Sequence, residues 1–306
     1  NKLVSTSNES GFLGNTDLQR SYIENVTFLD STTDANETVW DVSEAQNSSI
    51  LAWYTTRIAT ITKTVKNEDG TTTETETTQE IYTVYIGSNG SIYANQNSSY
   101  LFANIGYARG CEATEAITNI ELLRTINVTN MSNMFYCCGF IAMTSLDLGY
   151  NFNTSNVTDM SNMFYYCGGR AMTELDLGDK FDTSKVNNMA DMFYMCGFTS
   201  MTELNLGDKF DTSQVTNMAD MFMSCEALTT LNLGDKFDTS QVTNMYCMFA
   251  DNSLTSLDLG DKFDTSQVTN MNAMFFLCKS LTELNLGDKF DTSQVTDMEW
   301  MFYECK

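Results

Sequence analysis

A single repeated motif constrains this chain more than any other feature. The pattern Met-x-x-Met-Phe occurs seven times in 306 residues, and the first Met of each copy follows the previous one by 29, 29, 29, 27, 26 and 27 residues. The length differences all fall in the linker between the Cys at the end of one copy and the apolar residue that begins the next predicted strand. Repeats of this length and number predict a solenoid whose loops absorb the insertions. The seven opening residues are Met131, Met160, Met189, Met218, Met245, Met271 and Met298.

Two hydrophobic periodicities alternate within each copy. Leu231 and Leu233 are two residues apart, which predicts a short strand with Asn232 turned outward. The apolar residues that follow Val215 lie 3, 6, 7 and 10 positions further on, which predicts one face of a short helix. Asp211 and the two hydroxyl residues after it precede this segment and are suitable helix N-caps.

These periods predict an α/β solenoid, a leucine-rich-repeat-like right-handed coil of seven to eight repeats, each with a short strand and a short helix. We assign residues 106–306 to this solenoid. Residues 1–38 form a polar N-terminal segment rich in Ser, Thr and Asn. Residues 39–105 are interpreted as a β cap with a long Thr-rich hairpin arm that turns at 67–70, because the end of a solenoid needs cover.

The repeated sequence motif resembles that of a known family. Leu-x-x-Leu-x-Leu-Gly followed by Asp-Thr-Ser-x-Val-Thr-x-Met-x-x-Met-Phe-x-x-Cys resembles the bacterial surface-protein repeat of about 26 residues, a branch of the BspA-like leucine-rich repeats. The resemblance covers residues 111–306. It implies a secreted or wall-attached protein associated with adhesion, and it implies neither a particular ligand nor a catalytic residue.

Composition narrows the possible partners. Forty acidic residues against 16 basic ones give a net charge of −24, which disfavours nucleic acid and anionic membrane surfaces. No apolar run is long enough to insert into a membrane. The chain has no His, and no Ser, Cys or Lys has an evident activating partner, so we do not expect an enzyme. The first residue is Asn and no apolar leader precedes it, which we interpret as a mature chain located outside the cell or on its surface.

The cysteines mostly share one position of the repeat, and Asn252 takes that position in one copy. A site that accepts Cys or Asn predicts a structural ladder in which a small buried donor meets backbone carbonyls. Two alternatives are one or two disulfides, such as Cys111 with Cys137 or Cys138, and a metal column. Cys137 and Cys247 lie outside the ladder. The predicted ladder is Cys138, Cys167, Cys196, Cys225, Asn252, Cys278 and Cys305.

The segment Gly-Asp-Lys-Phe-Asp recurs in successive copies, so stacking of the coils would align its aspartates in columns. Turn and cap roles explain these aspartates, and calcium bridging between neighbouring coils is the alternative. No other cofactor is expected, and no copy carries a private cluster of aromatic and polar residues that would predict a small-molecule pocket. The calcium candidates are Asp208, Asp211, Asp235, Asp238, Asp261 and Asp264.

The last copy predicts an open apolar stacking face, because no strand or polar cap follows it here. Our first hypothesis is a structural protein that assembles head to tail into filaments, its N-terminal cap covering the last copy of a neighbour. The alternative is a monomeric cell-surface adhesin that binds a host protein or glycan through its repeated surface. The residues predicted to self-associate are Trp300, Met301, Phe302 and Cys305.

Overall fold

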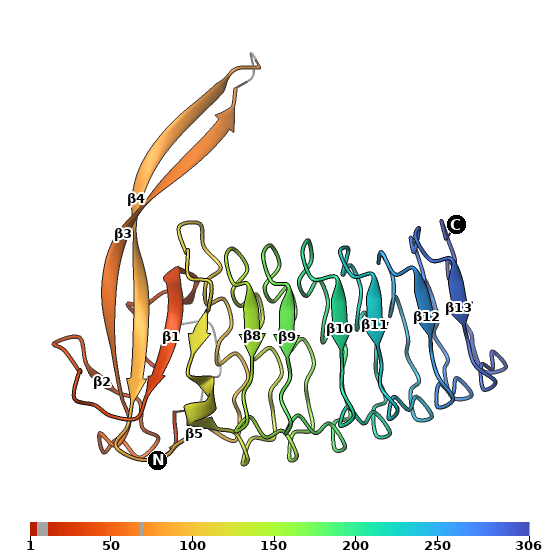
Figure 1. The fold of residues 1–306 in the computed structure, drawn as a ribbon, viewed down its shortest axis with the longest axis horizontal. Coiled ribbons are helices and arrows are strands. Elements are labelled where there is room, and N and C mark those ends of the chain that lie inside the picture. Colours follow the sequence, from red (N-terminus) through yellow and green to blue (C-terminus); the bar gives the residue numbers. More distant parts are fainter. Residues whose placement is uncertain (5–11, 68–69, 306) are drawn as a thin grey trace.

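The chain folds into an elongated solenoid whose N-terminal end carries a small sheet and a projecting arm (Figure 1). The computed structural model describes residues 1–4, 12–67 and 70–305. Successive coils lie side by side along the long axis, and the C-terminal coil is at the end opposite the arm. The strands are β1 Ile23–Leu29, β2 Trp40–Asp41, β3 Leu51–Lys66, β4 Thr72–Gly87, β5 Ile92–Tyr93, β6 Ile117–Thr118, β7 Leu123–Arg124, β8 Ser145–Asp147, β9 Glu174–Asp176, β10 Glu203–Asn205, β11 Thr230–Asn232, β12 Ser256–Asp258 and β13 Glu283–Asn285, with 3-10 turns η1 Arg20–Tyr22 and η2 Ile120–Leu122.

The N-terminal sheet has the strand order β2-β3-β4-β1-β6. β3 and β4 pair antiparallel from Leu51 opposite Gly87 to Lys66 opposite Thr72, while β1 runs parallel to β4 and β6. The sheet therefore combines β1 from the polar segment 1–38, the 39–105 region and β6 from the solenoid segment. Thr-rich alternation on both sides of a turn explains the long β3–β4 hairpin.

Each later coil contributes one three-residue parallel strand. The central Leu of the strand points inward and its two neighbours are exposed in β9, β10 and β12. The strands associate in pairs, β8 with β9, β10 with β11 and β12 with β13. The predicted strand and its period are thus confirmed, and the ladder is interrupted after every second coil.

The prediction of a short helix in each copy is wrong. Within the described residues the only helical elements are the two 3-10 turns, and the Met-x-x-Met-Phe segment is a tandem of four-residue turns. The Met221 amide donates to Met218 O at 3.3 Å within the coil, whereas the next amide, that of Phe222, donates to Met248 O of the following coil at 2.9 Å. Asp220 (φ 57°) and Ser224 (φ 56°) are left-handed, which ends any α-helix.

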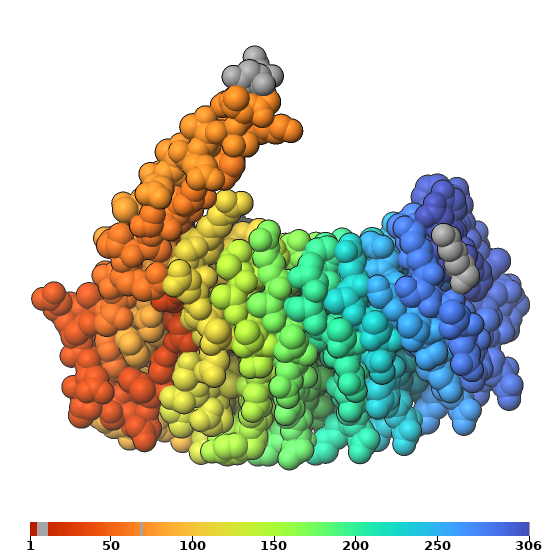
Figure 2. All heavy atoms as spheres, turned by 45° about the horizontal axis from the view of Figure 1, so that its top comes forward, coloured from red at the N-terminus to blue at the C-terminus, as the bar shows by residue number. Residues whose placement is uncertain are grey.

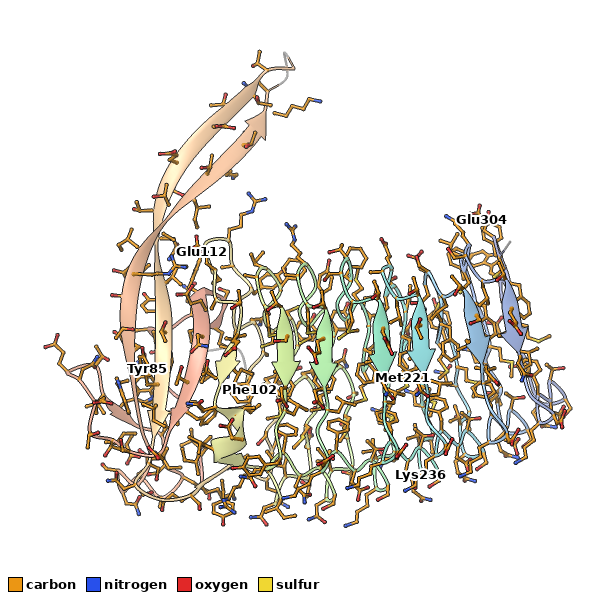
Figure 3. All side chains as sticks on the ribbon, in the orientation of Figure 1. Tyr85, Phe102, Glu112, Met221, Lys236 and Glu304 are labelled. Carbon is orange, nitrogen blue, oxygen red and sulfur yellow. The ribbon has the colours of Figure 1, made fainter. Side chains whose placement is uncertain are left out.

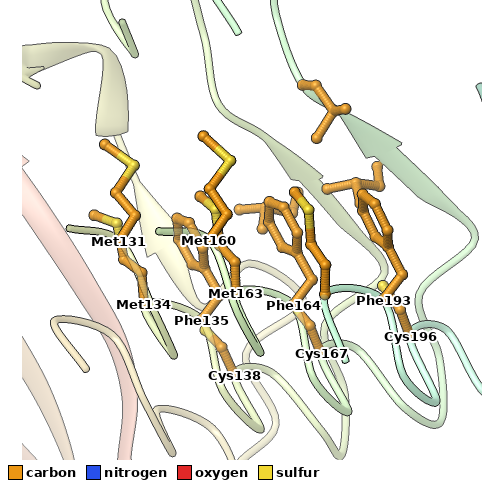
Figure 4. Packing of buried hydrophobic residues seen from close by; sticks show 14 of the residues in the cluster. Met131, Met134, Phe135, Cys138, Met160, Met163, Phe164, Cys167, Phe193 and Cys196 are labelled. Atoms are coloured by element: carbon orange, nitrogen blue, oxygen red, sulfur yellow. The ribbon is translucent and has the colours of Figure 1, made fainter. Parts of the chain in front are cut away.

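Turns of four residues place side chains on the inside at i, i+3, i+4 and i+7, the same spacing that one face of a helix shows. Met131, Met134, Phe135 and Cys138 follow this spacing and are all fully buried (Figure 4). The hydrophobic pattern therefore identified the core residues correctly, although it did not distinguish between the two backbone conformations.

A continuous column of phenylalanine rings runs through the core. Neighbouring rings stack with centroids 5.3 to 5.6 Å apart, and Met side chains pack beside them (Figure 4). Offset-stacked aromatic pairs are favourable beyond the area they bury. The column consists of Phe102, Phe135, Phe164, Phe193, Phe222, Phe249, Phe275 and Phe302.

The stack of four-residue turns, each hydrogen-bonded to the next coil, begins before residue 106. The Phe102 amide donates to Met134 O at 2.8 Å, and Asn97 bridges Asn130 as Asn130 bridges Asp159. This coil has Leu101 and Phe102 where later copies have Met-Phe, so the repeated word does not reveal it. The solenoid consequently shares residues 97–105 with the segment that we assigned to the β cap.

Candidate interaction surfaces

The cysteine ladder is a structural column. The thiols of Cys225 and Cys278 donate to the carbonyl oxygens of Phe193 and Phe249 at 3.1 Å, each in an earlier coil. All nine cysteines are free. Burial raises the pKa of Cys225 to about 12, as it does for Cys278. These thiols are therefore protonated at neutral pH and are poor nucleophiles.

Asn252 occupies the same column with an amide in place of a thiol. Its Nδ2 donates to Phe222 O at 3.1 Å and to Phe249 O at 2.8 Å. The side-chain oxygen is buried and has no hydrogen-bond partner. Cys137 and Cys247, outside the ladder, occupy left-handed turn positions at φ 53° and 50°.

The repeated aspartates act locally in turns. Asp211 Oδ1 accepts the Ser213 amide at 3.0 Å, and Asp238 and Asp264 accept the equivalent serine amides. Asp208, Asp235 and Asp261 lie in the exposed Gly-Asp-Lys loops. Within the described ranges no three Cys, Asp or Glu side chains converge as a metal site requires, so the geometry gives no support to the calcium alternative.

Two grooves open on the strand side where neighbouring coils are unpaired. One lies between β9 and β10 and the other between β11 and β12, where the strands stand further apart than the paired ones (Figure 1). A Cβ added at Gly234 would lie 2.7 Å from Gly207 O, whereas a Cβ at Gly207 would meet no atom within 4 Å. The coils therefore stack evenly along the phenylalanine column and in pairs along the strands.

The last coil leaves its apolar side uncovered. Trp300, Phe302 and Tyr303 are 59%, 48% and 51% exposed, although Phe302 stacks on Phe275 at 5.3 Å. Met301 differs from the prediction, because it is only 7% exposed and belongs to the core. Cys305 is half-buried, and its thiol donates to Phe275 O at 2.8 Å. Of the four residues predicted to self-associate, Trp300 and Phe302 present the most surface.

An aromatic edge, which the sequence interpretation missed, follows the coils with the longest loops. Outward-facing tyrosines stack on one another, Tyr136 on Tyr165 at 4.8 Å and Tyr165 on Tyr194 at 4.6 Å. The signal was present as Tyr at the residue after Met-Phe in three consecutive copies. The next two copies carry Met223 and Ala250 there, which ends this stack, and the last two carry Phe276 and Tyr303, whose rings stack on each other at 5.3 Å.

A second aromatic row runs beside the tyrosine stack. Phe140 lies 5.2 Å from Tyr107 and 4.7 Å from Tyr166, and the Arg170 guanidinium lies 5.3 Å above the Phe140 ring. A Cβ on Gly169 would lie 2.6 Å from the Phe140 ring, so this position leaves room only for Gly. The sequence interpretation did not predict this row, which is shared by successive coils and is not private to one copy. We define the aromatic edge as Tyr107, Tyr136, Phe140, Tyr165, Tyr166, Tyr194 and Phe198.

Two carboxylates lie beside the tyrosine stack. Burial and the nearby carboxylate of Asp191 raise the pKa of Asp220 to about 7, and burial also raises the pKa of Asp191. Their coulombic effect reaches Tyr194, whose own pKa is raised, first by burial and then by both carboxylates. With a pKa of about 7, the Asp220 carboxyl is the group beside the tyrosine stack whose charge changes near neutral pH.

A partly buried ion pair anchors the arm to the first loop of this edge. Arg57 of β3 makes two hydrogen bonds to Glu24, at 2.9 and 2.6 Å, and a third to Gly110 O at 2.7 Å. Glu24 also accepts the Glu112 amide at 3.1 Å. Figure 3 shows Glu112 at the base of the arm and Glu304 at the far end of the same edge. The arm and the loop edge are thus on one side of the molecule.

The fold and these surfaces define a class, a repeat solenoid with a stacked aromatic core and an N-terminal mixed sheet. The chain belongs to the family described as Mycoplasma protein of unknown function, DUF285, whose model matches residues 106–230 and again 196–306. No curated protein and no solved structure matches the chain. Within the described residues, no helix has the length and apolar character needed to cross a bilayer.

Proposed function

We propose that this chain is a non-enzymatic extracellular surface protein that associates with copies of itself through the last coil. The observation that supports the proposal best is the exposed face of Phe302, the last ring of the described phenylalanine column. Phe302 stacks on Phe275 by one face and is 48% exposed. Phe290 and Val295 are half-buried, whereas their counterparts Phe263 and Val268 are fully buried. Apolar surface of this kind associates with a matching partner.

The two ends of the solenoid are unlike, which favours a head-to-tail contact. The N-terminal end is covered by the β2-β3-β4-β1-β6 sheet, and the last coil presents stacked rings and one unpaired edge of β13. A contact between two different surfaces does not close on itself, so repetition produces a filament. The proposed partner is therefore a second copy, with no role for nucleic acid or for membrane insertion.

Light scattering over a concentration series tests this association. A Trp300→Asp/Phe302→Asp double variant places charges on the exposed face, and Tyr150→Asp, at a residue that is 64% exposed in an early coil, is the matched control. At 500 mM salt, where contacts between exposed charges are screened and apolar contacts persist, we expect concentration-dependent growth in mass for the wild type and the control and a constant monomer mass for the double variant. Equal masses for all three proteins at every concentration would reject the proposal.

The aromatic edge favours a second candidate function. Kinship with the BspA-like surface proteins, suggested by the repeated word, would make the chain an adhesin that binds a host protein or glycan. Half-exposed tyrosines with adjacent carboxylates, such as Tyr165 and Tyr194 beside Asp191, offer both apolar contact and hydrogen bonding. Binding of the monomeric Trp300→Asp/Phe302→Asp variant to immobilised extracellular glycoproteins, lost in Tyr165→Ala/Tyr194→Ala, would support this candidate.

A further inference from the structure

The distal arm consists of two strands that pair with each other and with no other strand of the described residues. We define it as residues 55–66 of β3 and 72–81 of β4. β2 pairs with β3 only at Leu51 and Ala52, and β1 pairs with β4 only from Tyr82 onward. Beyond these points each strand has one edge paired in the hairpin and one edge free. Figure 2 shows the arm standing clear of the solenoid.

An arm of this kind is a poor structure on its own. Most of its residues are exposed, including Ile58 at 62% and Val65 at 44%, whereas Ala59 and Ile81 at its base are buried with Cys111. A two-stranded hairpin without a covered face is marginally stable in water. Long free edges of β-strands accept further strands, and proteins use them for docking.

The two free edges carry opposite charge. On β3 the distal charges are Lys63 and Lys66, since Arg57 is paired with Glu24, and on β4 they are Glu74, Glu76 and Glu80. Glu80 accepts a hydrogen bond from the Tyr82 hydroxyl at 2.9 Å, and none of these five side chains makes an ion pair with another described residue. The arm therefore offers one basic and one acidic edge.

The register of the hairpin separates Lys63 from the glutamates of the same arm. Lys63 is opposite Thr75, whereas Glu74 and Glu76 are opposite Thr64 and Thr62. Residues directly opposite one another share a face, and successive residues alternate. Lys63 thus points to the face away from the glutamates, whereas Lys66, opposite Thr72, points to the same face as they do. The arm of a second molecule can lie with either face up, so it can bring its glutamates to the face that Lys63 occupies.

From these observations we propose that the distal arm docks onto the distal arm of a second copy, with the basic β3 edge of one arm along the acidic β4 edge of the other. The whole chain carries a net charge of −24, so copies repel one another, and the β3 edge supplies a local positive surface. The arm contact adds to the proposed self-association and uses none of the last-coil residues.

Charge reversal tests the arm contact. All proteins carry Trp300→Asp/Phe302→Asp, so that the last coil is disabled and the arm acts alone. One variant adds Lys63→Glu/Lys66→Glu, a second adds Glu74→Lys/Glu76→Lys, and Lys236→Glu/Lys262→Glu in exposed solenoid loops is the control with matched charge. Circular dichroism verifies folding, and sedimentation velocity measures association at 50 and 500 mM salt.

We expect the parent and the control to associate at low salt and to dissociate at high salt, because exposed charges are screened. Each arm variant alone should associate at least about tenfold more weakly than the parent. A one-to-one mixture of the two arm variants should associate again, because the glutamates introduced on one arm meet the lysines introduced on the other. The arm proposal is overturned if the mixture stays monomeric, or if the arm variants associate as the parent does. Failure of the last-coil proposal would appear separately, as unchanged self-association in Trp300→Asp/Phe302→Asp at 500 mM salt, where the arm contact is screened.

Discussion

Phe302 stacks on Phe275 with ring centroids 5.3 Å apart and planes 4° from parallel, yet Phe275 is fully buried and Phe302 is half-exposed. The difference arises because Phe275 has a ring on each side, Phe249 and Phe302. The same side chain in the same turn thus has two environments, which allows the contribution of a neighbouring coil to be measured.

Removing a ring inside the column should cost much more than removing the last ring. Phe222→Ala leaves a cavity between two stacked rings and should lower the free energy of unfolding by about 3 to 5 kcal/mol. Phe302→Ala removes a half-exposed ring and should cost about 1 kcal/mol. Urea denaturation of the two variants at low protein concentration measures both values. Similar costs at the two positions would contradict the continuous stacked core.

Asp220→Asn should stabilise the protein at alkaline pH and have little effect at acid pH. The pKa of Asp220 is raised to about 7 by burial and by Asp191, above the value of about 3.9 for an unfolded chain. The folded state then holds the proton more tightly, so Asp220 lowers stability progressively from about pH 4 to pH 7. Asn also tolerates the left-handed backbone at φ 57°.

The comparison is made by thermal melting at pH 4 and pH 8, with Asp208→Asn in an exposed loop as the control. The Tm gain of Asp220→Asn should appear at pH 8 and shrink at pH 4. A gain that is equal at both pH values would show that the carboxylate is not the cause.

The paired stacking of coils predicts different outcomes for two equivalent glycines. Gly207 and Gly234 share φ 76°, so alanine is strained at both. Only at Gly234 does the added Cβ come within 2.7 Å of the preceding coil, at Gly207 O. Gly234→Ala should therefore lower the Tm more than Gly207→Ala does. Equal losses would indicate uniform spacing of the coils in solution.

Breaking the ion pair at the base of the arm should destabilise the N-terminal sheet. Arg57→Met leaves the buried Glu24 carboxylate without its main donor and should cost about 2 kcal/mol at neutral pH. Burial acts to raise the pKa of Glu24, but the hydrogen bonds from Arg57 and the Glu112 amide outweigh it and lower that pKa. The stability gained from the pair is present above about pH 4 and is lost as the pH falls further.

Hydrogen exchange of the arm and sheet amides, followed by mass spectrometry, localises this effect. Exchange should quicken in β1, β3 and β4 of Arg57→Met and remain unchanged in the coils near Phe249. Arg170→Met, which removes a guanidinium that lies on the Phe140 ring, is the control. Faster exchange spread evenly over all coils would contradict a local anchor.

The repeated word was sufficient to predict the solenoid, its strands and most of its core, because burial depends on spacing. Leu204 and Leu257 are central in their strands as expected, and Met218 and Phe222 are buried as expected. The helix was not excluded by the same spacing, because four-residue turns and a helix both bury i, i+3, i+4 and i+7. The two backbone conformations differ at left-handed residues other than Gly, such as Asp220. The identity of such a residue does not reveal its φ angle in the sequence.

The interaction surfaces were less predictable than the fold. The exposed Trp300 and Phe302 followed from the last copy, but Met301 belongs to the core because the turn directs it inward. The aromatic edge depends on which side chains from different coils meet. Tyr107 and Phe140 are 33 residues apart in the chain and touch only because their loops are stacked.

Negative-stain electron microscopy of the purified protein over a range of concentrations, at 500 mM salt so that the arm contact is screened, tests the central proposal most directly. The account predicts that the wild type forms filaments, that Tyr150→Asp forms them equally well, and that Trp300→Asp/Phe302→Asp does not. Filaments that persist in the double variant, or single-subunit particles in the wild type at every concentration, would contradict self-association through the last coil.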